Sequence, residues 1–189
     1  MVVQDPMGQL ASARRVLVLG SPGSGKTTLT LRLARALGLE AIHLDAEFWK
    51  PGWVSTPQPA WREVVGALVQ RDAWIMDGTY ESTLDLRIPA ADLLIEIKRS
   101  RLTCLYHVLR RKATIDDHAR PDAPAGQALD WPFIRYIWNY PCITDPLVRE
   151  RIQEYGPDKP VIEIRGHHAM RLFIAGLPAS ARRQAEASE

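Results

Sequence analysis

Short apolar runs alternate with longer stretches of helical periodicity over most of the chain. Five runs have the length and composition of buried strands, and they cover residues 15–19, 41–44, 73–76, 92–97 and 161–164. Helical patterns follow them over residues 26–37, 60–71, 101–112, 131–155 and 170–175. This alternation is typical of βα units, so it predicts a three-layer α/β domain with a five-stranded parallel sheet. Right-handed crossovers place the carboxyl ends of the strands at one edge, where ligands bind in such folds.

Two of the helical patterns carry further expectations. In residues 101–112, apolar side chains recur at helical spacing and predict the inner face of a basic amphipathic helix: Leu102, Leu105, Tyr106 and Leu109. Residues 131–155 contain Pro141 and Pro146, which predict that this helix is kinked or broken near those positions.

The two ends of the chain differ from its middle. We expect residues 1–13 to form a flexible leader and residues 179–189 a flexible tail. Residues 14–178 are expected to form a single domain, because no repeat or linker divides them. A chain of 189 residues is long enough for one domain with a full hydrophobic core.

Composition and charge narrow the class of protein. Apolar residues make up 46% of the chain and charged residues 24%, which excludes global disorder. The net charge of +2 is too small to indicate a nucleic-acid binder, so direct nucleic-acid binding is disfavoured without being excluded. Two cysteines without metal-ligand spacing favour a reducing compartment, and no apolar run has the length of a membrane span. We therefore expect a cytoplasmic protein without a membrane partner.

The first predicted strand ends in a glycine-rich sequence that satisfies the eight-position P-loop pattern: Gly20, Ser21, Pro22, Gly23, Ser24, Gly25, Lys26 and Thr27. Glycines let the backbone wrap around phosphates, and the N-terminus of the following helix adds positive potential. Lys26 is predicted to bridge the β- and γ-phosphates of ATP, Thr27 to bind Mg²⁺ and Thr28 to support the α-phosphate side. The alternative is a turn that merely ends a strand, which the strand–loop–helix context disfavours.

Two aspartates follow the second and third predicted strands. Asp77 ends an apolar run before a glycine, and we expect it to orient Mg²⁺. Asp45 is expected to meet the phosphoryl acceptor and to serve as the general base. For both residues the alternative is an exposed aspartate that ends a strand or caps a helix.

Basic residues gather around the predicted helix at 101–112. A basic helix that leads into a mobile excursion is what a phosphate-covering lid requires, so we expect a lid at about residues 110–130. Arg110, Arg111 and Arg120 are the candidates to stabilise the transferred phosphoryl group, and Arg87 is a candidate to bind the acceptor. A solvated basic surface, or a weak nucleic-acid patch, is the alternative.

Aromatic residues are dense between Phe48 and Trp53. Trp49, Trp53 and Phe48 are candidates to form the wall of an acceptor pocket. The alternative is a satellite hydrophobic cluster beneath a long loop. An exposed aromatic segment is also compatible with a homodimer.

Several segments together resemble a known family. The resemblance rests on the P-loop, on the run from His43 to Trp53, on Trp74–Tyr80 and on Thr83–Arg87. These segments look like those of the DNA topology modulation proteins, which are small P-loop proteins related to adenylate and shikimate kinases. The match runs in order from about Arg15 to Ala175.

The resemblance implies an adenylate-kinase-like sheet with strand order 2-3-1-4-5 and a helical lid. It places Asp77 at the metal-orienting Asp-Gly turn of nucleotide kinases, and Asp45 at the acceptor-side aspartate of shikimate kinases. It also places Arg165 where related kinases pack the adenine of the nucleotide. Two departures concern the acceptor: no Phe-Pro-Arg follows Gly78, and Ala46-Glu47 replaces the second aspartate of the shikimate-kinase pattern.

The sequence thus predicts a kinase that transfers the γ-phosphate of ATP to a small-molecule acceptor with Mg²⁺. The alternative is a P-loop ATPase or regulatory protein associated with DNA topology or nucleic acid. The sequence does not name the acceptor.

Overall fold

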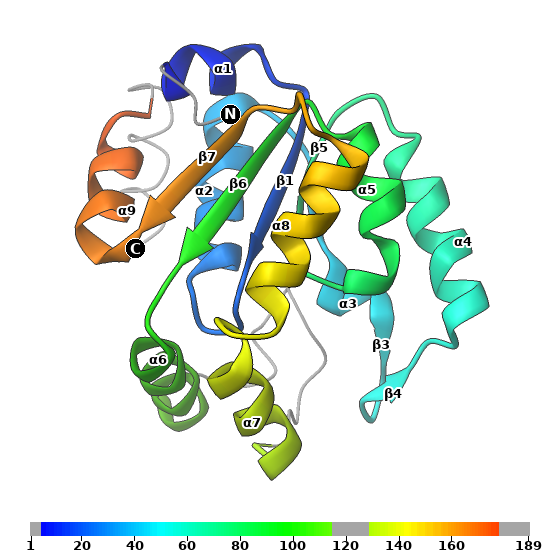
Figure 1. Cartoon of the computed structure of the whole chain (residues 1–189), viewed down its shortest axis with the longest axis vertical. Coiled ribbons are helices and arrows are strands. Elements are labelled where there is room, and N and C mark those ends of the chain that lie inside the picture. Colours follow the sequence, from blue (N-terminus) through cyan, green and yellow to red (C-terminus); the bar gives the residue numbers. More distant parts are fainter. Residues whose placement is uncertain (1–4, 115–128, 178–189) are drawn as a thin grey trace.

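The computed structural model describes residues 5–114 and 129–177. Its centre is a parallel sheet in the order β2–β5–β1–β6–β7 (Figure 1). The strands are β1 (Arg15–Gly20), β2 (Ala41–His43), β5 (Trp74–Asp77), β6 (Leu93–Lys98) and β7 (Val161–Arg165). Taken in chain order, these five strands have the predicted order 2-3-1-4-5, and each lies within one or two residues of its predicted run.

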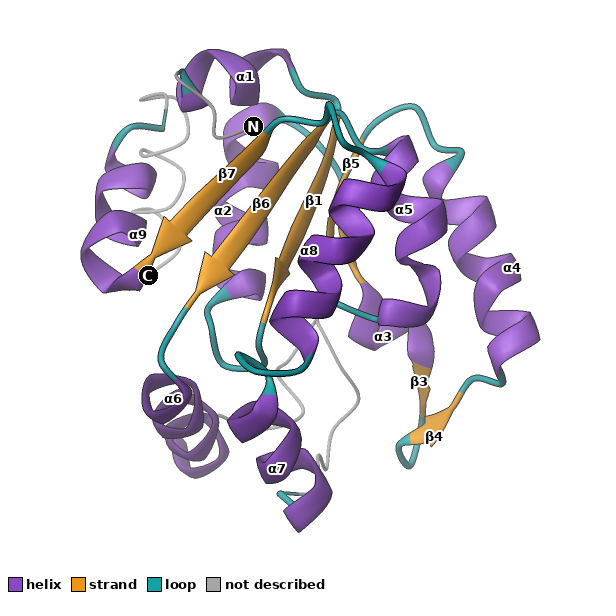
Figure 2. Cartoon of the chain, in the orientation of Figure 1, coloured by secondary structure: helices purple, strands orange, loops and turns teal. Residues whose placement is uncertain are grey.

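Helices cover both faces of the sheet, as predicted for a three-layer domain (Figure 2). One face is covered by α4 (Gln58–Val69), α5 (Leu84–Ala90) and α8 (Thr144–Tyr155). The other face is covered by α1 (Pro6–Ser12), α2 (Lys26–Leu37) and α9 (Gly166–Ala175). The strands are apolar on both faces and almost entirely buried, because each face packs against a layer of helices.

Helix α1 lies within residues 1–13, where we expected a flexible leader. Asp5 caps its first turn by accepting a hydrogen bond from the Gly8 amide, and Pro6 occupies the first helical position. Leu10 is only 1% exposed and packs into the core with α2 and α9. The leader prediction was therefore wrong for residues 6–12, whose single buried leucine is too weak a pattern to indicate a helix. The predicted tail, residues 179–189, lies outside the described residues.

Helix α6 (Arg101–Thr114) buries a face that shares only Leu105 with the one we predicted; Leu105 is half-buried and packs against the cluster of Cys104, Val108 and Ile137. Leu102, Tyr106 and Leu109 are 67%, 60% and 54% exposed, whereas Cys104 and Val108 are buried. The helix rests on the phosphate loop: a side chain at Gly23 would come within 2.4 Å of the Cys104 carbonyl oxygen. This close contact fixes the inner face of α6, and the leucine spacing alone could not indicate it.

The predicted helix at residues 131–155 is two helices, α7 (Trp131–Asn139) and α8. The chain breaks at residues 140–143, which include Pro141. Pro146 causes no break because it lies in the first turn of α8, where a missing N–H group costs no helical hydrogen bond.

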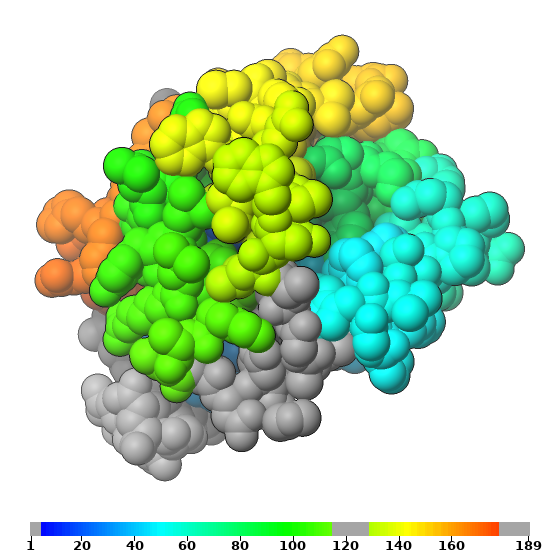
Figure 3. Space-filling view, turned by 90° about the horizontal axis from the view of Figure 1, so that it is seen from below, coloured from blue at the N-terminus to red at the C-terminus, as the bar shows by residue number. Residues whose placement is uncertain are grey.

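Short elements that the sequence pattern did not reveal surround the carboxyl edge of the sheet. They are α3 (Leu44–Phe48), the antiparallel pair β3 (Trp49–Lys50) and β4 (Val54–Ser55), and a 3₁₀ turn at Glu81–Thr83. Figure 3 looks at this edge and shows α6, α7 and the β3–β4 segment gathered on it. None of the helices in the described residues is long and apolar enough to cross a membrane.

Candidate active site

A cavity of about 1120 Å³ opens at the carboxyl edge of the sheet. Its walls come from the phosphate loop, from α3 and the β3–β4 segment, from the loop after β5, and from α6 and α7. Segments that are far apart in the sequence thus meet at the edge where parallel strands end, as expected for this fold.

The phosphate loop forms one end of the cavity. Gly23 and Gly25 have φ values of 77° and 98°, which side-chain-bearing residues rarely adopt, and α2 begins immediately afterwards at Lys26. The residues of the loop and of the first turn of α2 that line the cavity are Gly20, Pro22, Gly23, Gly25, Lys26, Thr27 and Thr28. Ser21 and Ser24 are buried behind it. This arrangement presents the N-terminus of α2 to the cavity, as an anion site requires.

Lys26 reaches across the loop. Its Nζ atom donates hydrogen bonds to the carbonyl oxygens of Gly20, at 2.7 Å, and Ser21, at 3.1 Å. Burial lowers the pKa of the ammonium, while the carboxylates of Asp45 and Asp77 act in the opposite direction. A phosphate oxygen in the cavity is a stronger acceptor for this cation than a carbonyl oxygen.

Helix α6 brings cationic side chains to the same end. Arg110 and Arg111 both line the cavity. His107 lines it too, and its Nδ1 atom lies 2.9 Å from the Gly23 carbonyl oxygen. Because a carbonyl oxygen only accepts, Nδ1 carries the proton in this contact. Arg120 lies outside the described residues, as does most of the segment predicted to form a lid.

Asp77 occupies the end of β5 and is almost fully buried. It is the register partner of His43 at the end of β2, and the His43 Nδ1 atom lies 2.8 Å from Asp77 Oδ2. Asp77 and Thr27 line the same cavity and offer carboxylate and hydroxyl oxygens, the donor type that Mg²⁺ prefers. The residues present therefore fit the predicted Mg²⁺ site.

Asp45 lies on α3 and lines the cavity. Its Oδ1 atom accepts a hydrogen bond of 2.7 Å from the Tyr80 hydroxyl. Burial, followed by the charge of Asp45, raises the pKa of Tyr80 well above its usual range, so the phenol stays protonated and keeps its donor role. Tyr80 thereby fixes the orientation of the carboxylate.

The aromatic residues divide between the cavity and the core. Trp49 and Trp53 line the cavity, with ring centroids 5.2 Å apart. Phe48 is buried beneath them and contacts Trp49, Trp61 and Tyr80 edge-on or at a tilt. The run thus contains both of the expected features: Trp49 and Trp53 form part of the cavity wall, and Phe48 belongs to a buried hydrophobic cluster that supports them.

Arg87 does not line the cavity, and this corrects its assignment as an acceptor-binding residue. Its side chain is fully buried. The guanidinium donates hydrogen bonds to three successive carbonyl oxygens, those of Gly78, Thr79 and Tyr80. Arg87 therefore holds the shape of the loop that follows β5.

Arg165 also lies away from the cavity walls. It is exposed at the end of β7 and pairs with Glu163 on the same strand. Arg165 is therefore not one of the residues that line the cavity, although the resemblance placed it where related kinases pack the adenine.

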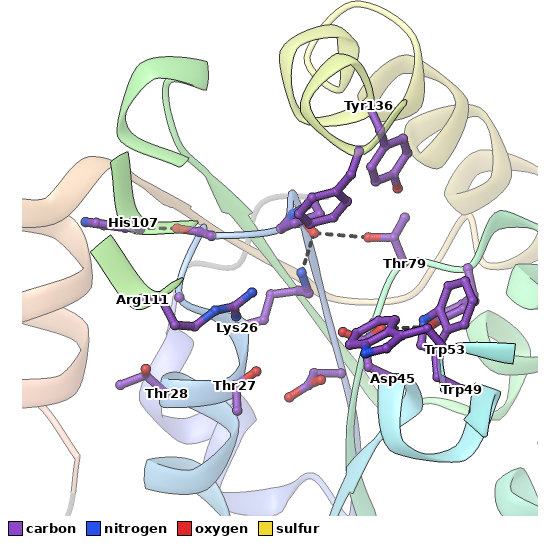
Figure 4. A pocket seen from close by; sticks show the side chains of 18 of the residues that line it. Lys26, Thr27, Thr28, Asp45, Trp49, Trp53, Thr79, His107, Arg111 and Tyr136 are labelled. Carbon is purple, nitrogen blue, oxygen red and sulfur yellow. Dashed lines mark hydrogen bonds between the residues drawn. The ribbon is translucent and has the colours of Figure 1, made fainter. Parts of the chain in front are cut away.

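Further lining residues were absent from our sequence-based candidates: Thr79, Tyr80, Glu81, His107 and Tyr136. Thr79 donates to the Gly20 carbonyl oxygen at 3.1 Å and so ties the loop after β5 to the phosphate loop. The Asp-Gly-Thr-Tyr sequence was the available signal for the first two. No sequence pattern marked His107 or Tyr136, because tertiary packing of α6 and α7 brings them in (Figure 4).

Comparison with solved structures shows kinases of similar fold. Shikimate kinase from Acinetobacter baumannii, in complex with shikimate, aligns with a TM-score of 0.54 and 19% identity, over 88% of this chain and 92% of that chain. A gluconokinase from Sinorhizobium meliloti 1021 aligns with a TM-score of 0.50 and 16% identity, over 92% and 94% of the two chains. Deoxyadenosine kinase from M. mycoides with bound dATP has a TM-score of 0.50 and 13% identity, over 85% and 97%.

The sequence matches no protein-family model and has no significant match among curated proteins. At identities this low, the structural similarity concerns the fold. It confirms the predicted fold class: the chain has the α/β fold of the small-molecule P-loop kinases.

Proposed function

We propose that this protein transfers the γ-phosphoryl group of ATP to a hydroxyl group of a small-molecule acceptor, with Mg²⁺ as the metal. One observation carries the proposal: the phosphate loop and the carboxylate of Asp45 open into a single cavity of about 1120 Å³. Two substrates can therefore meet there, and the kinase neighbours have the same fold.

The phosphate end supplies positive charge. Lys26 and the N–H groups at the start of α2 would bind the β- and γ-phosphates. Arg110 and Arg111 line the same cavity and would stabilise the charge that spreads over the equatorial oxygens during transfer. Thr27 and Asp77 would hold Mg²⁺, which neutralises phosphate charge when it is bound.

Asp45 would act as the general base. The acceptor hydroxyl gives its proton to the Asp45 carboxylate while its oxygen forms a bond to the γ-phosphorus. The bond between that phosphorus and the β,γ-bridging oxygen breaks, and ADP leaves with the electron pair. The hydrogen bond from Tyr80 would keep the carboxylate aimed at the acceptor.

We also infer a relationship to the DNA topology modulation proteins. Support comes from the sequence resemblance in the P-loop, the His43–Trp53 run and the Asp77–Tyr80 turn. The structural neighbours are small-molecule kinases, which favours phosphotransfer over a DNA-associated ATPase.

The proposal is tested by measuring ADP release for the wild type and for Lys26→Ala with a panel of small alcohols. We expect acceptor-dependent release that falls at least about 100-fold in Lys26→Ala, because the cation on the transferred group is lost. Lys50→Ala is the matched control, since Lys50 is exposed and does not line the cavity. Equal turnover in wild type and Lys26→Ala would contradict the proposal. Release that depends on DNA alone would support the ATPase alternative.

A further inference from the structure

The carbonyl oxygen of Gly20 accepts hydrogen bonds from two side chains. Lys26 Nζ donates to it at 2.7 Å and Thr79 Oγ1 at 3.1 Å, and Figure 4 shows both hydrogen bonds converging on one oxygen. Gly20 is the last residue of β1, whereas Thr79 lies just beyond the end of β5. These two strands are neighbours in the sheet, so the threonine hydroxyl extends their contact into the phosphate loop.

The direction of these hydrogen bonds follows from the groups involved. A carbonyl oxygen only accepts, so the single hydroxyl proton of Thr79 goes to Gly20. The Tyr140 hydroxyl lies 3.1 Å from the same Thr79 oxygen and must therefore be the donor in that contact. Tyr140 is 5% exposed, and burial raises the pKa of its phenol well above the usual range, so the phenol keeps its proton. Hydrogen bonds are thus donated from Tyr140 to Thr79 and from Thr79 to Gly20.

Thr79 is itself held from two sides. Its backbone carbonyl oxygen accepts a hydrogen bond from the buried guanidinium of Arg87. Its hydroxyl group is held by Tyr140, the residue that follows the last residue of α7. Because both its backbone and its side chain are anchored, Thr79 is a firm support for the carbonyl group that it contacts.

The position of the Gly20 carbonyl group matters because it helps to hold the ammonium group of Lys26. An ammonium group has three N–H donors, and Lys26 directs two of them to the carbonyl oxygens of Gly20 and Ser21. The third is left for a phosphate oxygen in the cavity that Lys26 lines. Since the three N–H bonds have a fixed tetrahedral arrangement, the two that are held determine the direction of the third. A displaced Gly20 carbonyl group would therefore turn the lysine away from the phosphate.

We propose that Thr79 and Tyr140 are positioning residues for Lys26: they hold the Gly20 carbonyl oxygen, and through it the direction in which the ammonium group meets a phosphate. Their effect on the nucleotide is exerted through Lys26. Helix α7, whose Tyr136 lines the cavity, is thereby connected to the phosphate loop. The inference rests on the nucleotide binding proposed above.

Binding of ADP with Mg²⁺, measured by titration calorimetry, tests this role without an acceptor. Thr79→Val keeps the shape of the side chain but removes the hydroxyl group, and it should raise Kd about 10-fold. Thr79→Ser restores the hydroxyl group and should bring Kd back to within about twofold of the wild-type value. Tyr140→Phe should raise Kd less, by about threefold, because Thr79 keeps its own donor.

A double-mutant cycle separates the positioning of Lys26 from a general loss of structure. In the Lys26→Ala background, Thr79→Val should raise Kd by less than about twofold, because no ammonium group is left to be directed. Thr56→Val is the matched control. Thr56 is similarly buried and donates to the Phe48 carbonyl oxygen at 2.7 Å, and neither of these two residues lines the cavity. Thr56→Val should lower the stability to urea but leave the Kd for ADP unchanged.

The outcomes distinguish this inference from the proposed function. An equal effect of Thr79→Val in both backgrounds would make Thr79 a structural residue only, and it would overturn the inference, as would an unchanged Kd in Thr79→Val. In either case the kinase function would stand. If the wild type does not bind ADP with Mg²⁺, the proposed function fails and the inference fails with it.

A milder variant decides the question if Thr79→Val does not fold. The same cycle is then measured with Tyr140→Phe, which removes one hydroxyl group and leaves the ring in place. We expect its effect on Kd to disappear in the Lys26→Ala background. An effect of the same size in both backgrounds would overturn the inference.

Discussion

Arg87 illustrates how a single residue can serve a site without touching its ligands. Its guanidinium donates to Thr83 Oγ1 and to three carbonyl oxygens of the loop that carries Thr79 and Tyr80. Burial lowers its pKa to about 9, which still leaves it protonated at neutral pH. The sequence showed an arginine near the predicted site, but only the folded chain reveals that its hydrogen bonds go to the backbone.

We predict that Arg87→Lys destabilises the protein by about 2–4 kcal/mol, because a lysine cannot satisfy all of the buried carbonyl oxygens. Urea unfolding at neutral pH measures this change. Arg62→Lys is the control, since the ion pair of Arg62 with Asp85 is exposed to solvent and its loss should change stability far less. An Arg87→Lys variant with normal stability and a raised acceptor KM would favour the acceptor-binding role instead.

Helix α6 is amphipathic, but of the four residues predicted for its inner face only Leu105 packs inward. Leu102, Tyr106 and Leu109 face solvent. Cys104 and Val108 pack with Leu105 against Ile137 of α7, and next to the phosphate loop. Periodicity shows that a helix has an apolar side, whereas the partner that covers it is a property of the whole fold.

We predict unequal stability effects for two adjacent residues of α6. Val108→Ala should cost about 1–3 kcal/mol through lost packing, whereas Leu109→Gln should change stability by less than about 0.5 kcal/mol. Denaturant unfolding of both variants measures the difference. If Leu109→Gln proves the more damaging substitution, the leucine-lined face is the buried one.

In the part of the chain that the structure describes, the two larger hydrophobic cores cover the two faces of the five-stranded sheet, and the cavity lies at the edge where both cores end. Nucleotide binding should therefore be detected as stabilisation of the entire domain. At a concentration of ADP with Mg²⁺ that is 100 times Kd, the gain is about 2.7 kcal/mol. In a chain of this size it should raise Tm by roughly 5–10 °C.

Thermal unfolding with and without ADP and Mg²⁺ tests this prediction. Lys26→Ala should lose most of the shift at the same ligand concentration, while Lys50→Ala should keep it. A shift of the same size in Lys26→Ala would mean that the nucleotide binds elsewhere.

The features that could be predicted from the sequence are those in which chemistry dictates residue identity. The glycines and Lys26 of the phosphate loop, Asp77 at the end of β5 and Asp45 shortly after β2 all required particular residue types in a particular context. The order of the sheet came from resemblance to known kinases. Helix α1 and the lining residues Glu81, His107 and Tyr136 escaped prediction, because short helices and tertiary contacts leave almost no periodic trace.

The contact between Gly23 and α6 limits which substitutions the protein can accept during evolution. Because the Cys104 carbonyl oxygen occupies the space that a side chain at position 23 would need, the loop and the helix are constrained together. A relative with a larger residue at position 23 must also have moved α6 and with it Arg110 and Arg111. The residue types at positions 23 and 108 should therefore change together, because Val108 contributes a side chain to this contact whereas Cys104 contributes only its backbone.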